Sequence, residues 1–182
     1  MTNDFDYLNG EVGEKTSYVP VPAARYQAVV AAAEMVDPIA LGWKPGEDAT
    51  EEQKADFERP FPRLRWKIEA MENGEETEYA GRLVDQRLDL RSGTNPRTGR
   101  SYAEHRADLL RATEGLKASD EVTGLKLLDV DMRGMDREEA ILAANQAMKK
   151  YEGVKATIRV INTTNKKTGE QRESVGKIVL PK

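Results

Sequence analysis

Residues 63–71 restrict the possible folds of this chain more than any other segment. Apolar side chains alternate there with charged ones: Leu64, Trp66, Ile68 and Ala70 on one face, and Arg63, Arg65, Lys67 and Glu69 on the other. A period of two is that of a β-strand with one face buried and the other in water. The Asn73-Gly74 pair then supplies the positive φ angles of a type I′ turn. The sequence therefore predicts a hairpin whose return strand covers residues 77–91.

Three further strands and three helices are predicted from the same kind of pattern. The strands are expected over residues 26–35, 154–163 and 173–180. The helices are expected to follow the N-capping side chains of Thr50, Ser101 and Asp136. Pro60, Gly115 and Gly153 mark the ends of these helices.

The order of the elements predicts a mainly β fold with helical insertions. Five strands are few for a sandwich, and a single helical block gives no βαβ alternation. A five-stranded OB-fold barrel with its helices between strands three and four matches this order, and closure would remove exposed strand edges. We expect one such domain over residues 19–182, preceded by a flexible acidic arm over residues 1–18.

Composition argues against most kinds of enzyme. The chain has 182 residues, no cysteine and one histidine, His105, which excludes a Cys–His pair and a thiolate metal site. We interpret His105 as a solvated side chain on a polar helix face, and Asp129 and Asp131 as solvated loop acids rather than magnesium ligands. No phosphate-binding glycine motif occurs. We expect no catalytic residue, no metal and no cofactor.

Charge is distributed unevenly along the chain. Residues 1–58 carry 4 basic and 12 acidic side chains, whereas residues 149–182 carry 9 basic and 3 acidic ones. No apolar run approaches the ~18 residues that span a bilayer, and the polar N-terminal residues do not form a signal peptide. We therefore expect a cytoplasmic protein without a membrane partner, and its oligomeric state stays open.

Three segments resemble a known group of proteins. Residues 19–30, 151–160 and 175–181 read VPVPAARYQAVV, YEGVKATIRV and VGKIVLP. They resemble phage-encoded OB-fold single-stranded-DNA-binding proteins, which act in replication and recombination. The resemblance implies a non-catalytic protein that binds single-stranded DNA in the host cytoplasm, with replication or recombination proteins as further partners. Many such proteins end in an acidic tail that recruits partners, whereas this chain ends Leu180-Pro181-Lys182, so tail-mediated recruitment is not expected.

An OB-fold binds nucleic acid across strands two and three, between the loops that join strands one and two and strands four and five. Cations for phosphates and aromatic rings for bases are the side chains this binding needs. The candidate cations are Arg63, Arg65, Lys67, Arg82, Arg87, Arg97, Arg100, Arg159, Lys166, Lys167 and Arg172. The candidate aromatic side chains are Trp43, Phe61 and Tyr79.

Other interpretations of these residues stay open. Trp43 and Phe61 either stack on bases or close the core, and the cations of strand two either meet phosphates or form a solvated face. The same cleft could instead bind a protein, which would make the chain an inhibitor or an assembly factor. Preference for DNA over RNA is not decided by the sequence.

Overall fold

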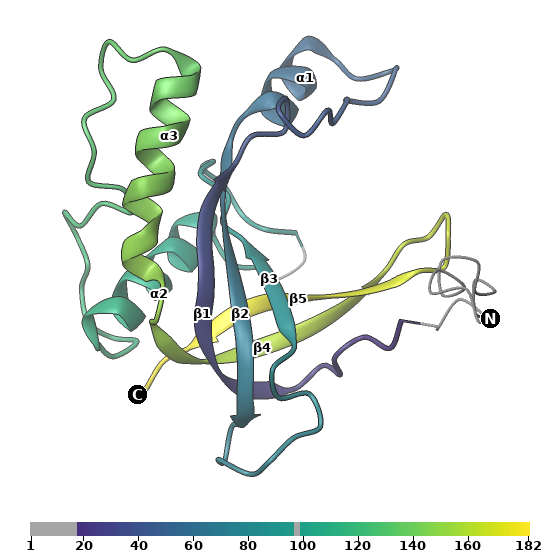
Figure 1. Cartoon of the computed structure of the whole chain (residues 1–182), viewed down its shortest axis with the longest axis vertical. Coiled ribbons are helices and arrows are strands. Elements are labelled where there is room, and N and C mark those ends of the chain that lie inside the picture. The colour runs from purple at the N-terminus through teal and green to yellow at the C-terminus, as the bar shows by residue number, and fades with distance from the viewer. Residues whose placement is uncertain (1–17, 97–98) are drawn as a thin grey trace, which may run out of the picture.

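The computed structural model of the chain describes residues 18–96 and 99–182. The architecture is mainly β, with one antiparallel sheet and three α-helices (Figure 1). The strands are β1 (Arg25–Val36), β2 (Phe61–Met71), β3 (Leu83–Arg87), β4 (Lys155–Thr164) and β5 (Gln171–Val179). The helices are α1 (Glu51–Glu58), α2 (Tyr102–Glu114) and α3 (Arg137–Met148), followed by the short 3-10 helix η2 (Lys149–Tyr151). The predicted arm lies outside the described residues except for Tyr18.

The sheet has the strand order β3-β2-β1-β4-β5. β1 pairs with β2 along almost its whole length and with β4 through Arg25–Val29 only. Its register with β2 shifts twice, between Gln27 and Ala28 and between Val30 and Ala32. Such bulges bend a strand and increase its twist. The β4–β5 hairpin consequently crosses behind β1, β2 and β3 in Figure 1.

The predicted closed barrel is wrong, because the sheet stays open between β3 and β5. These two strands come into contact but form no ladder within the described part of the chain. Two cavities, of about 330 and 430 Å³, are lined by side chains from both strands. β3 has only five residues, so it is too short to follow β5 along its length.

The short β3 also corrects the predicted hairpin. Gly74 has a φ of +84°, but no described non-glycine residue has a positive φ, so Asn73 cannot sit in a type I′ turn. Gly74 N instead donates to Met71 O, and Met71 N donates to Glu75 O, both at 2.9 Å. This is a type I turn followed by a glycine bulge. A second turn, in which Arg82 N donates to Tyr79 O, delays the return strand to Leu83.

The capped helices form where the sequence predicts them. Thr50 and Asp136 make complete capping boxes with Gln53 and Glu139. Ser101 accepts from the Glu104 N–H, but the Glu104 carboxylate turns away to Arg100. No helix among the described residues is long and apolar enough to cross a membrane.

The core lies on the inner face of the curved sheet. Leu64, Trp66 and Ile68 are buried there, as the alternation of residues 63–71 predicts. Helix α3 packs against β1, where Met35 N donates to the Asn145 side chain at 2.6 Å. The buried indole Nε1 of Trp66 donates to Gln86 Oε1 at 2.9 Å, which joins β2 to β3 through a polar contact inside the core.

Replacing Gln86 with Leu should lower the free energy of unfolding by about 1–3 kcal/mol, because the buried Trp66 N–H loses its acceptor. Urea unfolding at pH 7 measures this change. The double variant Trp66→Phe with Gln86→Leu removes both partners, so its loss should be smaller than the sum of the two single losses. Additive losses would show that the hydrogen bond contributes nothing.

Candidate nucleic-acid interface

The outer face of β2 and β3 carries cross-strand rows of charged side chains. Register places Arg63 between Glu34 of β1 and Arg87 of β3. Arg63 Nε donates to Glu34 Oε1 at 3.0 Å. In the next row Arg65 Nε donates to its cross-strand partner Asp85 at 3.1 Å. Two of the predicted phosphate ligands are therefore neutralised by carboxylates of neighbouring strands.

Arg87 is different, because it lies over an aromatic ring rather than against a carboxylate. Its Cζ atom is 3.9 Å from the centroid of the Phe61 ring. No carboxylate among the described residues lies within ion-pair distance of its guanidinium. Partial burial lowers the pKa of Arg87 against the opposing attraction of Asp89, yet the group remains a cation near neutral pH.

Trp43 extends this stack toward solvent. Its ring is 6.1 Å from the Phe61 ring, at an interplanar angle of 27°. Phe61 is buried at the start of β2, whereas Trp43 is 46% exposed. Trp43 N donates to Pro38 O at 3.0 Å, within a turn where Gly42 has a positive φ. Phe61 thus contacts both an exposed indole and a guanidinium.

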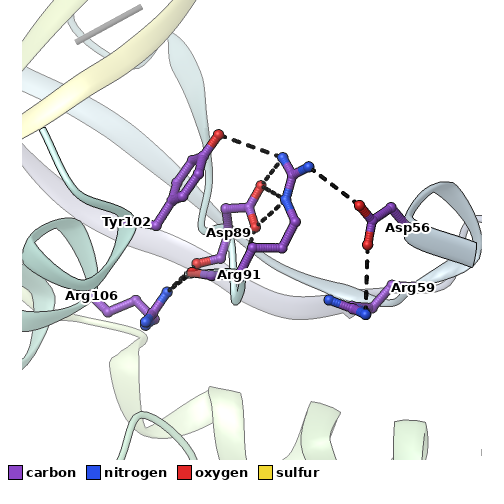
Figure 2. Close-up of polar contacts among 6 residues, drawn as sticks. All are labelled: Asp56, Arg59, Asp89, Arg91, Tyr102 and Arg106. Atoms are coloured by element: carbon purple, nitrogen blue, oxygen red, sulfur yellow. Dashed lines mark hydrogen bonds and ion pairs between the residues drawn. The ribbon is translucent and has the colours of Figure 1, made fainter. Parts of the chain in front are cut away.

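A polar network centred on Arg91 reaches α1, which belongs to the loop of residues 37–60 that carries Trp43 (Figure 2). Arg91 makes a bidentate contact with Asp89, with Nη2 to Oδ2 at 2.6 Å, and its Nη1 lies 3.8 Å from Asp56 of α1. Its Nη2 donates to the Tyr102 hydroxyl at 3.5 Å. Arg106 of α2 donates to the carbonyl of Asp89 at 2.6 Å. The segment after β3 is therefore connected to both α1 and α2.

The same loop is held from the opposite side by α3. Arg137 Nη2 donates to Asp37 at 2.8 Å and to the carbonyl of Glu58 at 2.6 Å. This hydrogen bond lowers the pKa of Asp37 although burial acts in the opposite direction. Arg137 therefore contacts both ends of the loop that carries Trp43.

Arg87 also lines the smaller cavity between β3 and β5. Arg91, Tyr102, His105 and Ser174 line it as well. His105 is only 8% exposed, so the expectation of a solvated histidine is wrong. Burial, followed by repulsion from Arg100, lowers its pKa, and it is neutral at pH 7. The helical pattern around His105 gave no sign of burial, because the cavity wall comes from distant strands.

Several other predicted ligands lie in ion pairs elsewhere. Arg82 lies 3.7 Å from Glu173 and donates to the carbonyl of Val19. Arg100 pairs with both Glu104 and Asp108, the latter at 2.8 Å. Arg172 lies 3.3 Å from Glu170.

The remaining predicted residues fall into three groups. Lys67, Lys166 and Lys167 are exposed, the first on β2 and the others in the β4–β5 loop. Tyr79 is half-buried and packs against the core, and Arg159 lies on β4, away from β2 and β3. Arg97 lies outside the described residues. The structure thus brings together Trp43, Phe61 and Arg87, but not the whole predicted set.

No family model matches this sequence, and no curated protein matches it closely enough to count as a relative. Within residues 18–96 and 99–182, no three histidine, aspartate or glutamate side chains gather where they could hold a metal ion.

Replacing Asp89 with Asn should destabilise the protein at pH 7 by about 1–3 kcal/mol, because a hydrogen-bonded charge is lost from the Arg91 network. Burial alone would raise the pKa of Asp89, but hydrogen bonds from Arg91 outweigh it and lower that pKa. The stabilising effect is therefore complete above the unfolded pKa of about 3.9 and is lost as the pH falls through the folded value.

Urea unfolding of the wild type and of Asp89→Asn at several pH values between about 7 and 3 measures this dependence. The stability difference between the two proteins should be constant down to about pH 4 and should then shrink. A difference that stays constant below that pH would show that the Asp89 carboxylate is not the titrating group.

Proposed function

We propose that this protein binds single-stranded DNA without catalysing a reaction, as a phage-type replication or recombination protein in the host cytoplasm. The binding surface is the outer face of β2 and β3, between the loop of residues 37–60 and the β4–β5 loop. The observation that carries the proposal is the exposed Trp43 stacked on Phe61, with the Arg87 guanidinium over the Phe61 ring and no carboxylate of the described residues within ion-pair distance of it. A flat ring next to a cation suits a base and its phosphate.

The strand order supports the same proposal. We assign the sheet to the OB-fold, because β3-β2-β1-β4-β5 is the order of that barrel opened between its third and fifth strands. OB-folds are partly open Greek-key barrels that bind oligonucleotides across strands two and three. The loop that carries Trp43 and the loop that carries Lys166 and Lys167 are then the two loops that border the cleft.

Energetics favours a single strand over a duplex. A base stacked on Trp43 contributes roughly 1–3 kcal/mol, and only unpaired bases offer this contact. Arg63 and Arg65 would have to break their hydrogen bonds to carboxylates before they could contact phosphates. The contacts with phosphates are therefore made by Arg87, Lys67, Lys166 and Lys167. The loop of residues 37–60 carries 7 acidic and 3 basic side chains, which repels the dense charge of a duplex.

Protein binding is the second candidate, and a separate surface favours it. Four exposed apolar side chains lie in the segment between α2 and α3 or on α3 itself: Leu125, Met132, Met135 and Leu142. Leu142 is 61% exposed. An assembly factor or inhibitor would use such a surface whether or not the cleft binds DNA.

Fluorescence anisotropy with a labelled oligonucleotide of about 15 nucleotides tests the proposal. Binding should be tight at low salt and should weaken as salt rises, with a slope of about −0.7 for each phosphate contact. Absence of binding at low salt would contradict the proposal and leave protein binding as the better candidate.

Replacing Trp43 with Leu should weaken this binding by about 1–3 kcal/mol through loss of base stacking. Leu41→Ala, an exposed change in the same loop, is the matched control and should bind like the wild type. Replacing Arg87 with Gln should reduce the salt slope, whereas Arg133→Gln, at an exposed site outside the cleft, should not. Equal affinities for Trp43→Leu and Leu41→Ala would place the binding surface elsewhere.

A further inference from the structure

Three cations face one another on the outer surface of β1, β4 and β5. Register places Arg159 of β4 directly opposite Arg25 of β1 on one side and Lys177 of β5 on the other. We call Arg25, Arg159 and Lys177 the basic row. Like charges directly opposite each other on neighbouring strands are destabilising. A fold that keeps three in one row carries an electrostatic penalty that a bound polyanion would relieve.

The basic row differs from the rows on β2 and β3. Arg63 and Arg65 each have a carboxylate directly opposite on a neighbouring strand. In the basic row only Arg25 meets a carboxylate, that of Glu72 at 3.2 Å. Among the described residues, none with a carboxylate lies within ion-pair distance of Arg159 or Lys177. The positive charge of these two side chains is therefore left unbalanced.

Register also connects the basic row to the proposed DNA-binding face. Val29 of β1 lies opposite both Lys67 of β2 and Lys155 of β4, so these two lysines share the outer face. Lys155 and Arg159 are four residues apart on one strand, which puts them on the same face as well. The only carboxylate within ion-pair distance of Lys155 in the described chain is Glu69, at 3.8 Å.

We propose that the basic row binds phosphates of the same single strand after it leaves the β2–β3 face. The nucleic acid then passes from Arg87 over Lys67 and Lys155 to Arg159 and Lys177, around the outside of the curved sheet. No aromatic side chain belongs to the basic row, so its contacts are with the sugar-phosphate backbone alone. This inference rests on the proposed function. It adds a second part to the DNA-binding path, in which no base stacks on an aromatic ring.

The test compares an oligonucleotide of about 5 nucleotides, near the smallest site of one OB-fold, with one of about 20 nucleotides, which is longer than the largest. The variant is Arg159→Gln with Lys177→Gln, and the control is Lys117→Gln with Lys126→Gln. The control removes the same charge from exposed sites outside the path. Since the variant removes a like-charge contact, its thermal midpoint should be no lower than that of the wild type.

The variant should bind the short oligonucleotide within about twofold of the wild type. It should bind the long one at least tenfold more weakly, with a salt slope shallower by about 1.4 for two lost phosphate contacts. Quenching of Trp43 fluorescence at saturation should not change. The control should match the wild type at both lengths. An equal loss at both lengths, or no loss at either, would overturn the inference while the proposed function stands.

A second arm uses inorganic polyphosphate, which has no bases. It should compete with the long oligonucleotide for the wild type and compete less well for the variant. If the wild type binds neither oligonucleotide, the proposed function fails. The basic row is then still supported as a polyanion site if the wild type binds polyphosphate more tightly than the variant. Equal binding of polyphosphate by both proteins would overturn it.

Discussion

β1 is the strand on which the rest of the molecule depends. It lies in the middle of the sheet and pairs with β2 and β4, and α3 packs against it. Its small buried side chains, Ala28 and Ala33, leave room for neighbouring elements on the inner face. Its two register shifts with β2 bend the strand, and β4 pairs only with its first residues, Arg25–Val29, whereas β2 follows it to Val36. Curvature in one strand thus sets where both proposed nucleic-acid surfaces lie.

Local patterns predicted the elements well. The alternation of residues 63–71 gave β2 and its buried face, because period two depends only on neighbouring residues. The starts of the three helices are predicted for the same reason. Each N-capping side chain, of Thr50, Ser101 and Asp136, accepts a hydrogen bond from a backbone N–H only three residues along the chain. The Asn73-Gly74 pair predicts the wrong turn, because Gly74 N donates to Met71 O and Met71 N donates to Glu75 O. A second turn, in which Arg82 N donates to Tyr79 O, then postpones β3.

Long-range features could not be predicted in the same way. The sequence indicates that Arg63, Arg65 and Lys67 face outward, but only register shows that Glu34 and Asp85 stand opposite the two arginines. Register likewise sets Lys177 opposite Arg159, and nothing local marks Lys177 as part of a row. Burial of His105 and contact between Trp43 and Phe61 depend on loops that close over long sequence distances.

The gap between β3 and β5 affects how copies of this chain meet one another. Within the described residues each of these strands has one edge without a ladder, and such edges can extend a sheet from one molecule into the next. Here the two edges face each other across cavities lined by charged side chains such as Asp85, Arg87 and Glu173. Each edge therefore covers part of the other, which leaves less free strand edge for a second copy of the chain to pair with.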